Sequence, residues 1–81
     1  MKILKFGAEW CTSCKTLDKL LEEIENKPYI EVIDIDVNSS DAIKYGIRGV
    51  PTLIKIDENN NIVDRIVGTK PKAELEKWLN D

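Results

Sequence analysis

The sequence predicts an α/β fold in which a mixed four-stranded sheet carries helices on both faces. Short apolar runs rich in Ile and Val alternate with segments of helical spacing, which is typical of strands joined by helices. Aromatic residues make up only 6% of the chain, so the core must consist mainly of the branched side chains that favour buried strands. Because the chain has 81 residues and a globular composition, we expect residues 1–81 to form one domain.

The first half of the chain predicts strand, helix, strand. Ile3–Phe6 is a short apolar run and forms the first strand. An amphipathic helix follows from about Thr12 to about Asn26, and Pro28 ends it. Ile30–Val37 is the second strand. The helix presents an apolar stripe formed by Leu17, Leu20, Leu21 and Ile24. The second strand presents Ile30, Val32 and Asp34 on one face, and Ile33, Ile35 and Val37 on the other.

The second half predicts a short helix, a hairpin and a last helix. Asn38–Asp41 offers N-cap side chains and Gly46 suits the C′ position, so a helix of barely two turns fits between them. Leu53–Ile56 and Ile62–Val67 flank a polar turn and should pair as an antiparallel hairpin. Pro71 suits the first turn of the last helix. One face of that helix carries Leu75, Trp78 and Leu79.

The predicted order is therefore βαβαββα. The right-handed crossover rule places the first and last helices on one face of the sheet and the short middle helix on the other. The loop that contains Cys11 then lies at the carboxyl end of the first strand, where open α/β sheets usually carry their functional groups.

Charge and composition exclude several function classes. Twelve basic and fifteen acidic residues give a net charge of -3, and no basic run could follow a phosphate backbone, so we expect no nucleic-acid partner. No apolar run approaches the roughly 20 residues that span a bilayer, and no secretory leader is evident, so we expect a cytoplasmic protein without membrane contact. The chain contains no His, which excludes Ser-His and Cys-His nucleophile pairs and most zinc sites.

The two cysteines, Cys11 and Cys14, are separated by two residues at the start of the first predicted helix. A structural disulfide here would close a loop too short to constrain the unfolded chain much. A metal site would need further ligands, which only a second chain could supply. A redox dithiol has a physical reason for this spacing, because one helical turn brings both sulfurs within bonding reach. The spacing favours the redox dithiol, and we expect no metal within one chain.

The position of each cysteine predicts its role. Cys11 lies at the helix N-terminus, where free N–H groups and the macrodipole favour a thiolate, so it should be an exposed nucleophile. Cys14 lies one turn inside and should be the resolving thiol that attacks a mixed disulfide. Trp10 could belong to the core, but a large ring beside a nucleophile favours a contact surface.

Two separated runs, Phe6–Lys15 and Tyr45–Leu53, resemble the thioredoxin family, and the likeness covers nearly the whole chain. The extra N-terminal strand and helix of the commonest thioredoxins look missing, which makes this a minimal version of about glutaredoxin size. The resemblance implies a thioredoxin fold and a thiol–disulfide oxidoreductase that reduces disulfide-containing protein substrates. It also implies a thioredoxin-reductase-type electron donor, no bound cofactor and a monomer.

The resemblance also implies a substrate groove. The Val50–Pro51 peptide bond should be cis, with Pro51 facing the two sulfurs and the backbone of Val50 pairing with an extended substrate segment. Gly49 and Gly68 correspond to family glycines that line the same groove. Without the resemblance, an ordinary trans proline that opens an edge strand would be the alternative.

The chain departs from the family pattern at Lys5, which stands where thioredoxins usually carry a buried acid; the usual lysine partner aligns with Val32. One hypothesis is that Lys5 lies near the sulfurs, favours thiolate and exchanges protons there. The alternative is that Lys5 reaches solvent or pairs with Asp34. Thr12-Ser13 replaces the usual Gly-Pro between the cysteines and should tune the reduction potential.

Three rival functions remain open from the sequence. A glutaredoxin-like, glutathione-coupled oxidoreductase fits the chain length, but Gly68–Pro71 resembles neither glutathione-binding pattern of that family. A thioredoxin-scaffold binding module would hold a protein partner and leave the dithiol incidental. A dimer bridged by metal or an iron–sulfur cluster would use the four thiolates of two chains.

Overall fold

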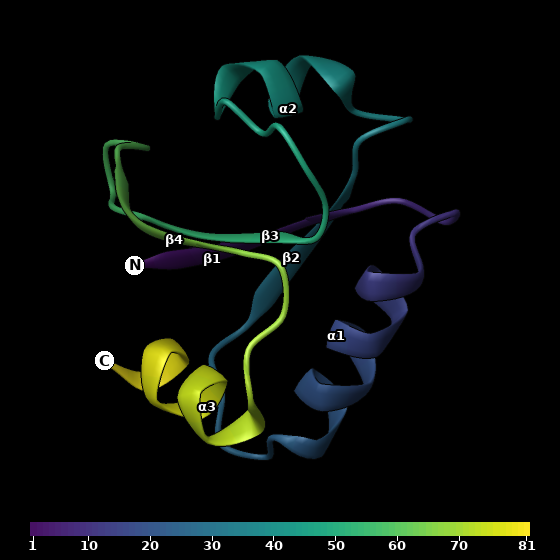
Figure 1. Cartoon of the computed structure of the whole chain (residues 1–81). Coiled ribbons are helices and arrows are strands. Elements are labelled where there is room, and N and C mark those ends of the chain that lie inside the picture. The colour runs from purple at the N-terminus through teal and green to yellow at the C-terminus, as the bar shows by residue number, and fades with distance from the viewer.

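The elements of the chain follow the predicted order. The computed structural model describes residues 1–81, and its strands and helices are β1 (Lys2–Gly7), α1 (Thr12–Glu23), β2 (Ile30–Asp34), α2 (Ser39–Lys44), β3 (Thr52–Ile56), β4 (Ile62–Val67) and α3 (Lys72–Asn80) (Figure 1). None of the three helices combines the length and the apolar character that crossing a membrane requires.

The sheet is mixed and has the strand order β2-β1-β3-β4. β1 pairs with β2 in parallel and with β3 in antiparallel, and the hairpin β3–β4 is antiparallel. Lys5 lies at the centre of the sheet, with Val32 as its partner on β2 and Leu53 as its partner on β3. The α/β class and the mixed four-stranded sheet predicted from the sequence are thus confirmed.

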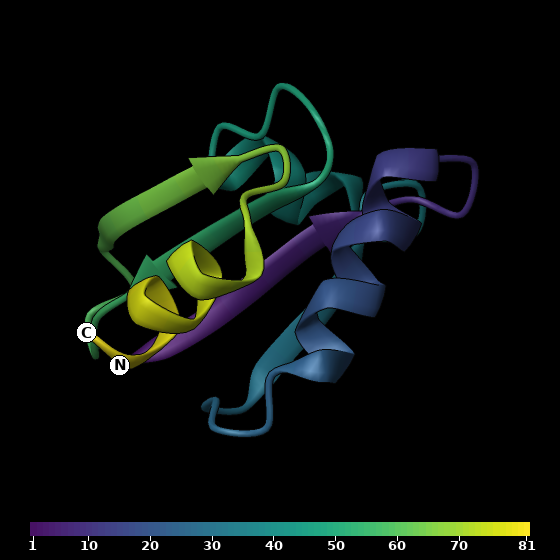
Figure 2. The same ribbon diagram turned by 60° about the horizontal axis from the view of Figure 1, so that its bottom comes forward.

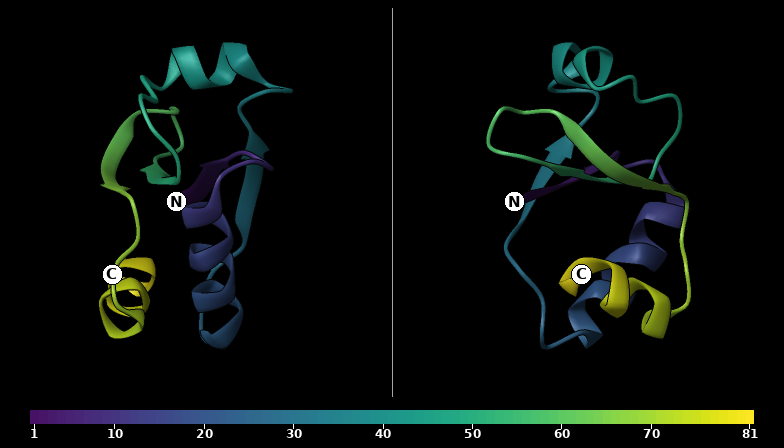
Figure 3. Two further views of the ribbon diagram at one scale, coloured as in Figure 1. Left: turned by 45° about the vertical axis from the view of Figure 1, so that its right-hand side comes forward. Right: turned by 90° about the vertical axis from the view of Figure 1, so that its left-hand side faces the viewer.

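Helices cover both faces of the sheet, and alternate residues of the central strands point to opposite faces. Figures 1 and 2 show α1 and α3 on one face and the short α2 on the other, and both views in Figure 3 agree. The core under α1 and α3 comprises Ile3, Leu17, Leu21, Ile24, Leu53, Leu75 and Leu79. The core under α2 comprises Leu4, Phe6, Ile33, Tyr45, Ile54 and Ile56.

Two predicted elements are longer than the observed ones. α1 ends at Glu23 instead of Asn26, because Ile24 turns to an extended conformation (φ -88°, ψ 108°) in which its side chain is completely buried. β2 ends at Asp34 instead of Val37, because the carbonyl of Asp34 accepts the N–H groups of Val37 and Asn38 and closes a turn. Val37 therefore lies on no sheet face, and the residue is 77% exposed.

The residues that predicted where α2 and α3 begin or end lie at those boundaries, but two of them differ in detail from the expected caps. Gly46 follows α2 with a φ of 65°, the left-handed conformation that glycine favours after a helix. Asn38 occupies the N-cap of α2, but its side chain makes no capping hydrogen bond. Pro71 is the N-cap of α3 and not a residue of its first turn. Trp78 packs half-buried against the core beside the buried Leu residues of α3.

Candidate active site

The two cysteines lie together where β1 passes into α1. Cys11 is the N-cap of α1, and its Sγ accepts the backbone N–H of Cys14 at 3.1 Å. A sulfur therefore takes the place of the side-chain oxygen that usually satisfies a free N–H at a helix start. Both thiols are free, and Cys11 is 5% exposed and Cys14 4% exposed. The sequence-based expectation of an exposed Cys11 is wrong, because the chain segment before β3 lies against its sulfur.

The segment before β3, which contains the predicted groove residues Gly49, Val50 and Pro51, lies beside Cys11. The Cys11 thiol donates to the carbonyl of Val50, with 3.7 Å between Sγ and O. The Val50–Pro51 peptide bond is cis, and Pro51 is buried. Gly68 has a φ of 84° and donates its N–H to the carbonyl of Pro51 at 2.8 Å, which joins the end of β4 to the same segment. The carbonyl of Gly49 accepts the hydroxyl of Thr52 at 2.7 Å.

Trp10 lies on the surface beside the cysteines, as predicted. The residue is 67% exposed, and its Nε1 donates to Oδ2 of Asp36 at 2.9 Å. Sequence reasoning missed Asp36, because the two residues come from different loops. Thr12 and Ser13 are exposed in the first turn of α1. This side of the site therefore offers an aromatic ring and hydroxyl groups to a partner.

Gly7 at the end of β1 allows the strand to approach the second cysteine closely. A Cβ atom at this position would lie 3.3 Å from Sγ of Cys14 and 3.6 Å from its Cβ. The first of these distances is shorter than about nine in ten real contacts of a Cβ atom. The absence of a side chain at Gly7 thus lets the buried sulfur of Cys14 lie directly against the sheet.

Lys5 forms an ion pair with Asp18 that was not predicted from the sequence. Its side chain is buried, and its ammonium contacts Oδ1 of Asp18 on α1. Both earlier alternatives, exposure to solvent and pairing with Asp34, are therefore wrong. Burial lowers the pKa of Lys5, and the neighbouring Cys14 opposes that shift. The signal for Asp18 was present, since it stands four residues after Cys14 and thus on the same face of α1.

The environment of Cys14 keeps its thiol protonated. Burial raises the pKa of Cys14, and its interaction with Cys11 raises it further. A backbone hydrogen bond from Ala8 and the positive charge of Lys5 lower the pKa in part. The dominance of burial means that the thiol of Cys14 gives up its proton less readily than an ordinary cysteine.

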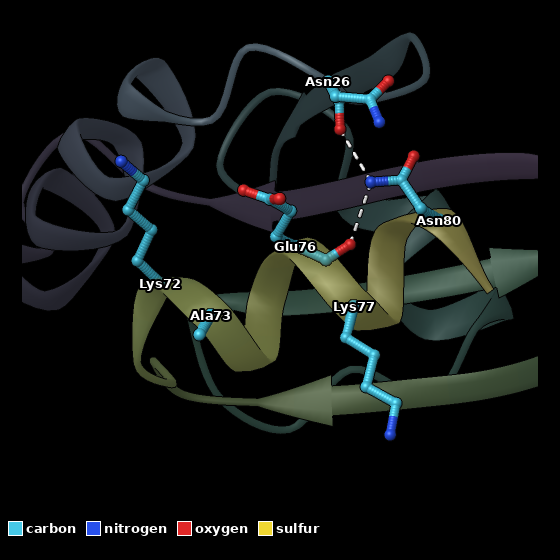
Figure 4. Close-up of a pocket in the computed structure, with 6 residues that line it drawn as sticks. All are labelled: Asn26, Lys72, Ala73, Glu76, Lys77 and Asn80. Carbon is cyan, nitrogen blue, oxygen red and sulfur yellow. Dashed lines mark hydrogen bonds between the residues drawn. The ribbon is translucent and has the colours of Figure 1, made fainter.

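Two cavities differ in what they could do chemically. A cavity of about 210 Å³ beside the second cysteine is lined by residues that include Lys5, Cys14 and Asp18. A more open groove of about 570 Å³ runs along α3, where the amide of Asn80 donates to the carbonyls of Asn26 and Glu76 (Figure 4). No cysteine lines this groove, whereas Cys14 lines the first cavity.

A free dithiol of this spacing at a helix start, facing a cis-proline segment, defines a class of protein that exchanges thiols and disulfides. The family profile described as Thioredoxin matches residues 1–81. A thioredoxin of Buchnera aphidicola subsp. Baizongia pistaciae is 40% identical in an alignment of length 82 that covers 96% of this chain and 74% of that protein. A thioredoxin of Staphylococcus epidermidis is 37% identical in an alignment of length 84 that covers 99% of this chain and 80% of that protein.

Solved structures show the same similarity in three dimensions. A mutant thioredoxin from Halobacterium salinarum superposes with a TM-score of 0.83 at 30% identity, over 96% of this chain and 70% of that one. A Schistosoma mansoni thioredoxin pre-protein superposes with a TM-score of 0.81 at 31% identity, over 96% and 74% of the two chains. The chain belongs to the thioredoxin family. It has the thioredoxin fold and is a thiol–disulfide oxidoreductase with Cys11 and Cys14 as its CxxC pair.

Proposed function

We propose that this chain reduces disulfide bonds of other proteins, with Cys11 as the attacking thiol and Cys14 as the resolving thiol. The observation that carries the proposal is the asymmetry of the two sulfurs. Sγ of Cys11 lies at the helix N-terminus, accepts the N–H of Cys14 and is next to the backbone of Val50, where a substrate segment would lie. Burial raises the pKa of Cys14, so that its thiol stays protonated until the second step.

Thiol–disulfide exchange with the substrate would proceed in two steps. The thiolate of Cys11 attacks one sulfur of the substrate disulfide, a Cys11–substrate S–S bond forms, and the other substrate sulfur leaves as a thiolate that takes up a proton. Cys14 then loses its proton and attacks Sγ of Cys11. The Cys11–Cys14 bond forms, and the second substrate sulfur leaves and is protonated. The protein dithiol is oxidised by two electrons and the substrate disulfide becomes two thiols.

The groove around Cys11 would hold the substrate as an added extended segment. The backbone of Val50 is next to the attacking sulfur, and Gly49, Pro51 and Gly68 belong to the same chain segments, with little side chain in the way. The exposed ring of Trp10 would supply apolar contact on the other side. Thr12 and Ser13 would set the reduction potential through their effect on the start of α1.

We also propose an electron donor, an oligomeric state and a location for this chain. A thioredoxin-reductase-type donor would return two electrons to the Cys11–Cys14 disulfide. We propose that residues 1–81 act as one domain, as a monomer, in the cytoplasm and without a bound cofactor.

Trapping of the mixed disulfide tests the two roles. Cys14→Ser should accumulate a covalent adduct with insulin, a disulfide-containing protein, because the adduct can form but cannot be resolved. Cys11→Ser should form no adduct and should reduce no insulin, whereas Thr16→Ser, an exposed control on the same helix, should reduce insulin as the wild-type chain does. Adducts formed by Cys11→Ser, or insulin reduction that persists in it, would overturn the assignment.

A further inference from the structure

Lys5 and Asp18 form an ion pair inside the fold, at a position where core packing alone would favour an apolar side chain. Lys5 is 7% exposed in the centre of the sheet, where an apolar side chain would pack without the loss of solvation. Oδ1 of Asp18 is buried against the Lys5 ammonium, yet 46% of the Asp18 side chain is exposed. Asp18 therefore connects an interior charge with solvent.

The spacing of β1 and α1 aligns this pair with the resolving cysteine. Two residues along a strand advance about 6.6 Å, and four residues along a helix advance about 6 Å. Gly7 on β1 lies against the sulfur of Cys14 on α1. Lys5 is two residues before Gly7 on the same face of β1, and Asp18 is four residues after Cys14 on α1, so these two residues also lie against each other. The pair is thus the layer directly below Cys14.

One cavity joins these three residues. Its volume of about 210 Å³ is enough for several water molecules, and its lining includes the polar groups that such waters need. The other charged groups that line it are Glu9 in the β1–α1 loop, Lys15 on α1 and Asp34 on β2. Glu9 and Lys15 are exposed and Asp34 is half-buried, whereas Lys5 is the one charged residue of the lining that is buried. Cys14, Lys5 and Asp18 thus line one cavity, and the Asp18 side chain also reaches solvent.

We propose that Asp18 accepts the proton that Cys14 loses when it resolves the mixed disulfide, and that Lys5 is the positioning residue that makes this transfer possible. The inference rests on the proposed function, because it concerns the second step of that reaction.

The pair allows the buried Lys5 ammonium to keep a counter-charge while the proton moves. Before the transfer, the Lys5 ammonium is balanced by the Asp18 carboxylate and Cys14 is a neutral thiol. After it, Asp18 is a neutral acid and the same ammonium is balanced by the Cys14 thiolate, so the buried layer stays balanced in charge during the proton transfer. The thiolate then attacks Sγ of Cys11, the substrate sulfur leaves, and Asp18 returns its proton to solvent. The opposed effects of Lys5 and Cys14 on each other's pKa agree with this coupling.

Single-turnover kinetics with dithiobis(nitrobenzoate) separate the two steps. Cys11 releases a first coloured thiolate in a phase whose rate depends on the reagent concentration, and Cys14 releases a second in an intramolecular phase. The leaving thiolate needs no proton, so the second phase reports the deprotonation of Cys14. In Asp18→Asn we expect the second phase to slow by about tenfold or more at neutral pH. Its rate should then rise about tenfold per pH unit, because the reaction depends on the small thiolate fraction.

Two further variants keep the test decisive. Lys5→Met/Asp18→Leu removes both charges together, so that no unpaired charge is left inside, and should show the same slow, steeply pH-dependent second phase. Glu23→Gln, an exposed carboxylate at the end of α1, should behave as the wild-type chain. A second phase in the double variant with wild-type rate and pH profile would overturn the proposal. The first phase should be unchanged throughout; its loss in the wild-type chain would refute the proposed function instead.

Discussion

Gly7→Ala provides a sharp test of how β1 and Cys14 are packed. The added methyl group would lie 3.3 Å from Sγ of Cys14, where ordinary contacts begin at about 3.4 Å, so strand or sulfur must move by a few tenths of an ångström. Neither moves freely. Cys14 is held by its N–H bond to Cys11, and the next turn of α1 is fixed by the completely buried Leu17.

The expected magnitude follows from two opposing terms. Overpacking in a well-packed core costs about 1–3 kcal/mol, while replacing a glycine gains about 0.4–1 kcal/mol through the reduced entropy of the unfolded chain. We therefore expect Gly7→Ala to lower the free energy of unfolding of the reduced protein by about 1 kcal/mol. For a domain of this size, that change corresponds to a melting temperature lower by roughly 4–8 °C.

A double-mutant cycle with Cys14→Ala identifies the cause. Without the sulfur, the remaining contact of the new methyl group is with the Cβ of residue 14 at 3.6 Å, which is ordinary. In that background Gly7→Ala should stabilise the chain by about 0.4–1 kcal/mol. Urea unfolding of the four proteins measures both effects. If Gly7→Ala is equally destabilising with and without the sulfur, the reasoning about close approach is refuted.

Three further outcomes are expected. Leu53→Ala empties a completely buried position of the sheet and should cost about 2–5 kcal/mol by urea unfolding; a cost below about 1 kcal/mol would contradict the packing described. Because the pKa of Cys14 is raised in the folded chain, reduced wild-type protein should lose stability relative to Cys14→Ser as pH rises above the ordinary value of 9.0, by at most about 1.4 kcal/mol per pH unit; a gain would have the wrong sign. Nε1 of Trp78 donates to Asp64 at 2.9 Å and lowers its pKa, so Trp78→Phe should raise the pKa of Asp64 toward 3.8 in an NMR titration, and an unchanged titration would count against that hydrogen bond.

The sequence predicted the element order, the sheet and its layers because these follow from local patterns. The apolar stripe of α1 and the alternation in the strands fix which faces are buried, and Gly46 marks the end of α2. The CxxC pair was recognisable for the same reason, since its two residues and the helix that positions them are contiguous. The exposed Trp10 was also predicted correctly from its place in the loop.

The parts that failed depend on contacts between distant segments. The burial of Cys11 results from Val50, which is far along the chain, and the end of β2 results from a turn that competes with the strand for the carbonyl of Asp34. Asp18 stands on the same helix face as Cys14, but its partner Lys5 could be assigned only once β1 was placed beneath α1. Pairing choices of this kind are set by tertiary packing, and a local pattern indicates at most one of the two partners.

The reduction potential of the Cys11–Cys14 pair tests the central claim most directly. The protein would be equilibrated in thiol buffers of defined potential, and the remaining thiols would be trapped with an alkylating reagent. A dithiol that reduces protein disulfides should have a potential near the thioredoxin value of about −270 mV. A potential above about −230 mV would contradict that function and would instead indicate glutathione-coupled or oxidising chemistry.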